Sequence, residues 1–195
     1  HLSIRRQRQM CIRDRLQQRQ AMVSRQIQAN GVTYNVYADP EGADRPWELD
    51  LLPNLLPAAE WQAIAAGVAQ RAGLLDKVLA DLYGPQHLLA EGLLPAELVF
   101  GQDGFLWPCQ GVQPPDSTYL HLYAVDLARS ADGQWRVIAD RTQAPAGAGF
   151  ALENRQIISR AFPELYRDLG VQHLAAFFRT LQDTLTSQAP VSYTH

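Results

Sequence analysis

The stretch YLHLYAVDLARSADGQWRVIADRTQAPAGAGFALENR, from Tyr119 to Arg155, decides the fold of this chain. Apolar residues flank Asp126, and Ser130-Ala131-Asp132-Gly133 supplies a tight turn in which glycine can take a positive φ. Residues 134–139 then alternate between polar and apolar types, as a return strand does. A loop rich in glycine and proline follows. The stretch therefore predicts a β-hairpin, a loop and then a helix.

Two carboxylates gather at one end of the predicted hairpin. Asp126 belongs to the first strand and Asp140 to the end of the second, so we expect both near the same end of two neighbouring strands. Carboxylate oxygens bind Mg²⁺, and nucleotide phosphates can supply the rest of its ligands. The pattern predicts a magnesium–nucleotide site. A plain surface hairpin with two solvated aspartates fits the same spacing.

A glycine loop leads into the helix predicted over residues 150–162. Gly147-Ala148-Gly149 would place backbone N–H groups at a helix start, which suits phosphate, although an ordinary flexible loop has the same composition. Glu153 and Arg155 fall in the first turns of this helix. Arg155 either contacts a phosphate or a substrate carboxylate, or joins Glu153 in ion pairs that hold the loop to the helix.

Several motifs in this order resemble the circularly permuted type 2 ATP-grasp family, which includes glutathionylspermidine synthase-like ligases. The resemblance runs from about Leu16 to about Pro190, and the order of the motifs makes it more specific than any one of them. The matching residues are Asp126-Leu127-Ala128-Arg129, Asp132-Gly133, Ile138-Ala139-Asp140-Arg141, Pro145-Ala146-Gly147, Asn30-Gly31-Val32-Thr33-Tyr34-Asn35-Val36-Tyr37, Asp81-Leu82-Tyr83-Gly84-Pro85-Gln86 and Glu153-Asn154-Arg155.

The chain departs from the family pattern where that pattern binds metal. Ala139 and Arg141 stand where more typical members carry the metal-binding Glu and Asn, and neither side chain can ligate Mg²⁺. Gln143 stands where an arginine is expected. Three alternatives are open: Asp140 takes over as ligand, Arg141 contacts phosphate directly, or the site is inactive.

The resemblance implies ATP-dependent carboxylate–amine (peptide-like) ligation through an acylphosphate. It also implies ATP and Mg²⁺ as cofactors, with small-molecule or peptide carboxylates and amines as substrates. The alternative is a catalytically inactive ATP-grasp-like binding module. Activity is an expectation for a full-length parent, whereas the present chain by itself is expected to be inactive. The implied site residues are Arg129, Arg141 and Arg155 for catalysis, Gln143, Gly147, Gly149, Glu153 and Asn154 for nucleotide binding, and Asp126 and Asp140 for metal.

Both ends of the chain look foreign to the protein. Met10-Cys11-Ile12-Arg13-Asp14 can be encoded by a DNA string whose reverse complement translates as Val191-Ser192-Tyr193-Thr194-His195. Inverted inserted ends produce this relation. We therefore expect residues 1–15 and 191–195 to be derived from a sequencing adapter, and residues 16–190 to be the N-terminal part of a truncated, circularly permuted ATP-grasp domain. The alternative is a basic N-terminal arm that binds nucleic acid.

Charge argues against nucleic-acid and membrane partners. The chain has 17 basic and 20 acidic residues. Without the five arginines and one aspartate of residues 1–15, 12 basic and 19 acidic residues remain, a net charge of −7. Such a chain lacks the positive surface that nucleic acid or an anionic membrane attracts. Outside residues 1–15, Cys109 is the single cysteine, which favours a reducing cytoplasm and a half-buried structural thiol.

Hydrophobic periodicity predicts an α+β fold in which helices pack on a mostly antiparallel sheet. We expect the longest helix over residues 58–83, where apolar residues recur at spacings of three and four. Asn35 and Tyr37 belong to a predicted strand, where they either line the cleft or serve strand packing. The other predicted elements are helices over residues 16–29, 86–91, 163–169 and 171–186, a strand over residues 32–37, and turns over residues 93–115 around an apolar piece at 98–100, with residues 105–107 in the core.

Overall fold

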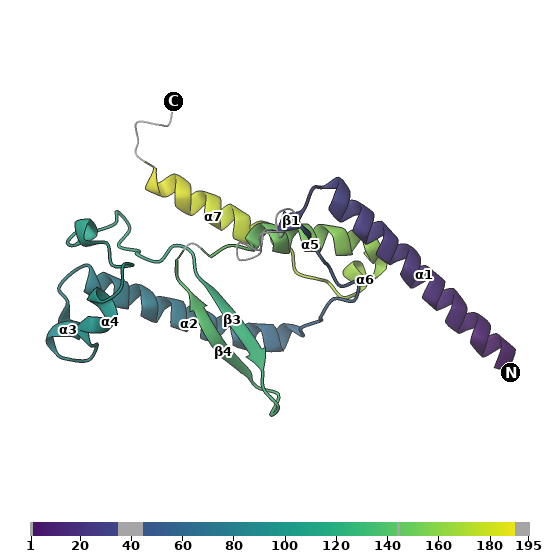
Figure 1. Cartoon of the computed structure of the whole chain (residues 1–195), viewed down its shortest axis with the longest axis horizontal. Coiled ribbons are helices and arrows are strands. Elements are labelled where there is room, and N and C mark those ends of the chain that lie inside the picture. Colours follow the sequence, from purple (N-terminus) through teal and green to yellow (C-terminus); the bar gives the residue numbers. More distant parts are fainter. Residues whose placement is uncertain (1, 35–44, 144, 190–195) are drawn as a thin grey trace. The chain divides into compact units, whose positions relative to one another are not determined.

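The structure, a computed structural model, describes residues 2–34, 45–143 and 145–189. Its contacts divide the chain into two units, and each is described by itself. The first unit comprises residues 1–55 and 146–174, and the second comprises residues 56–145 and 175–195. Helices accompany two antiparallel strand pairs, which confirms the predicted α+β class. The helices are α1 (Leu2–Ala29), α2 (Ala58–Leu82), α3 (His87–Ala90), α4 (Ala96–Phe100), α5 (Ala148–Ala161), α6 (Pro163–Asp168) and α7 (Ala175–Gln188), with a 3-10 turn η1 (Trp107–Cys109). The strands are β1 (Thr33–Tyr34), β2 (Arg45–Pro46), β3 (Ala124–Arg129) and β4 (Trp135–Arg141). Figure 1 labels all of these elements except η1 and β2.

The first unit is held together by a small apolar core between α1 and α5. Val23 and Ile27, one helical turn apart on α1, are both buried. Gly31, with a φ of +62°, follows the end of α1 at the predicted stop. The helix begins at Leu2 and not at the predicted residue 16. The remaining core residues are Leu51, Ile157, Ile158, Ala161 and Phe162.

The strand predicted over residues 32–37 is described only in its first part. Thr33 and Tyr34 pair antiparallel with Pro46 and Arg45. Asn35 and Tyr37, both candidates for a cleft, lie outside the described residues.

Helix α2 organises the second unit through polar side chains along its length. Glu60 accepts a hydrogen bond from the indole of Trp135 on β4. Asp76 accepts the backbone N–H groups of Tyr119 and Leu120, both at 2.8 Å, and Asp81 accepts those of the first two residues of α3 at 2.9 Å. Carboxylates that accept backbone N–H groups replace the water these groups would otherwise bind. The hairpin of β3 and β4 crosses α2 (Figure 1), and the hydrogen bond from Trp135 to Glu60 joins the two.

Residues 93–115 differ from the prediction. The apolar piece at 98–100 belongs to helix α4, because Pro95 precedes that helix and Gly101 ends it. Leu106 and Trp107 are exposed, not part of a core, and Cys109 is exposed, not half-buried. Helix α7 begins at Ala175 and not at residue 171. Among the described residues, no helix has the length and apolar character needed to cross a membrane.

Candidate functional site

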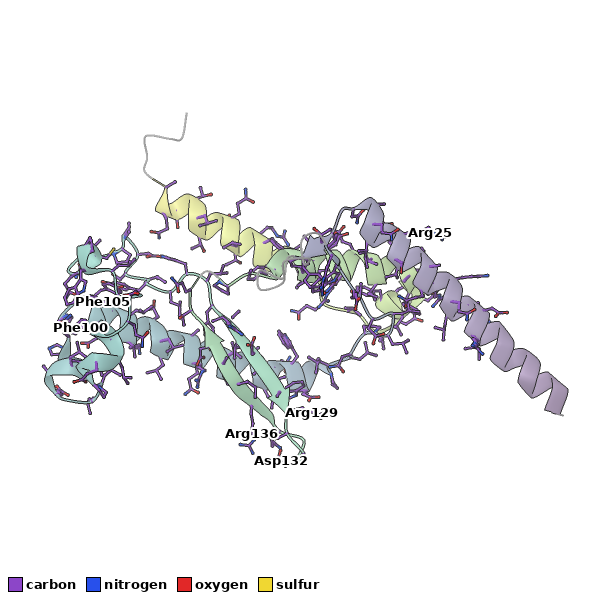
Figure 2. All side chains as sticks on the ribbon, in the orientation of Figure 1. Arg25, Phe100, Phe105, Arg129, Asp132 and Arg136 are labelled. Carbon is purple, nitrogen blue, oxygen red and sulfur yellow. The ribbon has the colours of Figure 1, made fainter. Side chains whose placement is uncertain are left out.

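The predicted hairpin forms, and its turn has the predicted chemistry. The backbone N–H of Gly133 donates to the carbonyl of Ser130 at 2.8 Å, and that of Ser130 donates to the carbonyl of Gln134 at 2.9 Å. Gly133 has a φ of +81°, which a residue with a β-carbon adopts at a cost. The side chains of Asp132 and Arg136 meet at 3.0 Å beside this turn (Figure 2).

A β-bulge interrupts the ladder halfway along the hairpin. Leu127 pairs with Val137, whereas the preceding residue, Asp126, pairs with Ala139. Ile138 therefore has no partner of its own, and its side chain is 67% exposed. A bulge of one residue moves every later side chain of its strand to the other face of the sheet.

The bulge places the two candidate carboxylates on opposite faces of the hairpin. Asp140 pairs with Val125, one position away from the Asp126–Ala139 pair. Paired residues share a face and successive residues alternate. The prediction of one spot shared by Asp126 and Asp140 is therefore corrected. In a regular ladder, Asp126 would pair with residue 138 and Asp140 with residue 124, which puts both on one face. Metal binding by either carboxylate alone stays a prediction.

Asp140 lies on the face toward α2 and is fully engaged there. The guanidinium of Arg71 donates two hydrogen bonds to its carboxylate, at 2.6 and 2.7 Å, and the hydroxyl of Tyr123 donates a third at 2.6 Å. The bonds from Arg71 and then Tyr123 lower the pKa of Asp140 to about 2. Burial, followed by the hydrogen bond to Asp140, raises the pKa of Tyr123. Asp140 is held as a carboxylate that joins β4 to α2.

Asp126 lies on the opposite, open face and pairs with an arginine. Two nitrogens of Arg141 lie 2.7 and 3.1 Å from one carboxylate oxygen of Asp126. Both side chains are about half exposed, at 49% for Asp126 and 61% for Arg141. Ion pairs this open contribute little stability and exchange readily with solvent. The pair leaves Asp126 accessible to other groups.

The structure engages Arg129 in the hairpin itself. Its guanidinium lies 3.3 Å from Glu60 on α2, donates to the carbonyl of Gly133 at 3.1 Å and lies over the ring of Trp135. These contacts lock the hairpin onto α2. Gln143 follows β4 and is exposed.

The other predicted nucleotide-binding residues belong to the first unit. Gly147 precedes α5 with a φ of +113°, and Gly149 lies in its first turn, so the glycine loop leads into a helix as predicted. Glu153 accepts a hydrogen bond from Asn30, Asn154 accepts the indole N–H of Trp47 at 2.8 Å, and Arg155 donates to the backbone carbonyl of Gln172. All three side chains connect α5 to other segments of its own unit. This favours a structural role for Glu153 and Arg155, although through hydrogen bonds and not through the predicted ion pairs.

The two-carboxylate magnesium site does not fit this hairpin. Its two candidate ligands face opposite sides, and no group of three His, Cys, Asp or Glu side chains converges within the described part of the chain. A single carboxylate supplies only a small part of the oxygen ligands that surround a bound Mg²⁺ ion. Magnesium bound at this hairpin would need ligands beyond Asp126 and Asp140.

Sequence reasoning missed Arg71 and Tyr123, which determine the state of Asp140. A signal for Arg71 was present. It stands three positions after Val68 and four before Leu75, beside the apolar stripe of the long helix, where an unpaired charge is costly. A charged residue there indicates an ionic partner in the packed neighbour. No comparable pattern marks Tyr123.

Comparison with known proteins adds two findings. The sequence pattern of the family "Circularly permuted ATP-grasp type 2" matches residues 53–195. The chain is also 35% identical over 160 residues to the uncharacterized protein sll0335 of Synechocystis, and 40% identical over 172 residues to the uncharacterized protein Rv2567 of Mycobacterium tuberculosis. The first match covers 82% of this chain and 33% of the Synechocystis protein, and the second covers 84% and 20%. The chain thus spans about a third and a fifth of these relatives.

Proposed function

Because this chain belongs to the circularly permuted ATP-grasp type 2 family, we propose that the natural full-length protein is an ATP-dependent carboxylate–amine ligase. The match over residues 53–195, which includes the whole hairpin, is the observation that carries the proposal. The two relatives named above are uncharacterized and supply no substrate. We propose small-molecule or peptide carboxylates and amines as substrates, with ATP and Mg²⁺ as cofactors.

The proposed reaction has two steps. A carboxylate oxygen of the substrate attacks the γ-phosphorus of ATP, so that an acylphosphate forms and ADP leaves. The nitrogen of the amine then attacks the acyl carbon, a C–N bond forms, the C–O bond to phosphate breaks, and the amine loses a proton. In such phosphoryl transfers, the protein contributes positioning and charge neutralisation.

We propose that the open face of the hairpin is the side that serves this chemistry. Asp126 and Arg141 lie there, half exposed and paired, and Ala139, the ladder partner of Asp126, lies on the same face. A guanidinium offers planar hydrogen-bond donors that suit phosphate oxygens. Arg141 is therefore the residue of this chain we propose to contact a phosphate. Asp126 would hold Arg141 in orientation until ligand binds.

The other predicted residues carry smaller proposed roles. Asp140 and Arg129 keep the hairpin seated on α2, as their contacts with Arg71 and Glu60 support. Arg155 and the glycine loop would act only if the natural protein brings phosphate to the start of α5. We further propose that residues 16–190 are part of a larger permuted domain, in keeping with relatives three to five times as long as their matched segments.

The test is ADP release by the natural full-length protein with ATP, Mg²⁺ and candidate substrates. We expect Arg141→Gln to lower ADP release about tenfold or more, since it removes a charge from the phosphate site. The matched control is Arg136→Gln, on the same strand and face but paired with Asp132 at the turn. Failure of the intact protein to bind nucleotide would remove the enzyme assignment. Equal losses of ADP release in both variants would contradict the proposed contact of Arg141 with phosphate.

A second candidate function is a catalytically inactive ATP-grasp-like binding module. The specific observation in its favour is that both hairpin carboxylates are already neutralised, Asp126 by Arg141 and Asp140 by Arg71. Nucleotide binding without ADP release, across a panel of carboxylates and amines, would favour this module over the ligase.

A further inference from the structure

The second unit exposes an aromatic surface near α3 and α4. Tyr83 and Phe105 stack with ring centroids 4.8 Å apart, and Phe100 stacks on Trp107 at the same distance. Phe105 also meets the ring of Trp107 edge to face at 4.9 Å. We call these four residues the aromatic corner. Phe100 and Phe105 are labelled in Figure 2.

Trp107 of the aromatic corner and two leucines beside the corner in the sequence are exposed to solvent. Trp107 is 60% exposed, its neighbour Leu106 is 57% exposed, and Leu98, on the same helix as Phe100, is 63% exposed. Single exposed apolar residues are ordinary, but a group of large ones beside a packed ring cluster marks an interaction surface. Tryptophan at such a surface is also a frequent contributor of binding energy.

The stretch of sequence that forms the aromatic corner is acidic. Residues 78–128 contain six acidic residues and no lysine or arginine. Glu97 and Asp103 stand within three positions of Phe100, and both are exposed. In the described part of the chain, neither belongs to an ion pair. An acidic rim around aromatic faces complements a cationic partner, because opposite charges attract at the rim and cations bind aromatic rings.

We infer that the aromatic corner docks a segment of the same polypeptide that lies outside these 195 residues and carries lysine or arginine around an apolar anchor. The inference rests on the proposed function in one respect, that this chain is part of a larger permuted domain. Relatives of which the chain spans a third or a fifth supply the length for such a segment. The chain itself already places arginines on aromatic rings, with Arg19 over Phe162 at 4.4 Å and Arg129 over Trp135 at 5.9 Å.

Cys109 provides a reporter within this surface. It ends the turn η1 that begins at Trp107, and its side chain is exposed in the present chain. A covering segment would shield it from a maleimide reagent in the natural full-length protein. We expect Cys109 of the folded protein to react at least tenfold more slowly than in the unfolded protein, with labelling located by mass spectrometry.

Charge reversal tests the cationic character of the occupant. We expect the double variant E97K/D103K to repel a basic segment and to raise the labelling rate of Cys109 at least fivefold. The matched control is E164K/D168K on α6, which reverses two exposed charges away from the aromatic corner in sequence and should leave the rate unchanged.

Three outcomes would overturn the inference. Cys109 could react equally fast in folded and unfolded protein, its protection could be insensitive to charge reversal, or its protection could rise with protein concentration, which indicates a second copy as the occupant. ADP release, measured on the same samples, separates this result from the proposed function. If Cys109 of the unaltered protein is unprotected while ADP release is intact, the docking surface is removed and the ligase remains.

Discussion

Replacing Tyr123 by phenylalanine removes one hydroxyl from the contact between the hairpin and α2 and leaves the ring in place. The hydroxyl donates to Asp140 at 2.6 Å in a part-buried position. A hydrogen bond to a charged group contributes about 1.5–3 kcal/mol when buried, and partial exposure reduces this value. We therefore expect Tyr123→Phe to lower the local stability of the hairpin by about 1 kcal/mol, which corresponds to about fivefold faster opening.

The assay is amide hydrogen exchange in the natural full-length protein, followed in peptides that cover β3, β4 and the middle of α2. Tyr119→Phe is the matched control, because its hydroxyl donates to the carbonyl of Val112 at 3.2 Å in an exposed position. Exchange should accelerate in β4 for Tyr123→Phe and stay unchanged there for Tyr119→Phe. Unchanged exchange in both variants, or acceleration in both, would show that the bond from Tyr123 to Asp140 does not hold the hairpin on α2.

Three further perturbations address other parts of the chain. Ile157→Ala opens a cavity in the core of the first unit, where Ile157 is 1% exposed. It should lower the free energy of unfolding, measured with denaturant, by about 3 kcal/mol. A loss below about 1 kcal/mol would contradict the packing of that core. The β-carbon added by Gly147→Ala would meet no atom within 4 Å, but the alanine must adopt a φ of +113°. We therefore expect a loss of stability of about 1 kcal/mol from backbone strain alone. A neutral or stabilising effect would show a different backbone at this position. Acidification tests the carboxylate of Asp140: a lowered folded pKa means that its stabilisation is present above the unfolded pKa of 3.8 and is lost as the pH falls toward about 2. Hairpin opening, corrected for intrinsic exchange, should therefore accelerate over that window in the parent and not in Asp140→Asn.

The hairpin shows which features a sequence specifies locally. Its turn was predictable because Asp132-Gly133 has few alternatives to a tight turn, and the alternation of residues 134–139 fixed the return strand. The bulge at Ile138 was not predictable from these signals. The bulge depends on a contact between β4 and α2. The extra residue turns Asp140 toward Arg71, which is 69 positions away in the sequence. One unpaired residue thus decided whether two carboxylates share a face.

The start of α5 shows a different limit. The sequence predicted a glycine loop before a helix, and the structure has one at Gly147. It could not tell that Asn154 would accept the indole N–H of Trp47, 107 positions away, because long-range partners leave no local pattern. Side chains of a family motif can therefore serve packing within their own unit as well as ligand binding.

The prediction for residues 105–107 failed for a compositional reason. Leucine is among the residue types most often buried, and tryptophan is highly buried on average, so hydrophobicity alone placed Leu106 and Trp107 in a core. Their exposure is informative because it coincides with an acidic surrounding sequence, which no core requirement explains.

Titration of the Asp140 carboxyl group shows whether this side chain joins the hairpin to α2 or binds metal. Selective ¹³C labelling of aspartate, with the signal assigned by its loss in Asp140→Asn, gives the pKa of this group with and without Mg²⁺ and nucleotide. We expect a pKa of about 2 and a signal that Mg²⁺ leaves unmoved, because Arg71 and Tyr123 already occupy the carboxylate. A pKa near 3.8, or a signal that shifts on addition of Mg²⁺ with nucleotide, would contradict it.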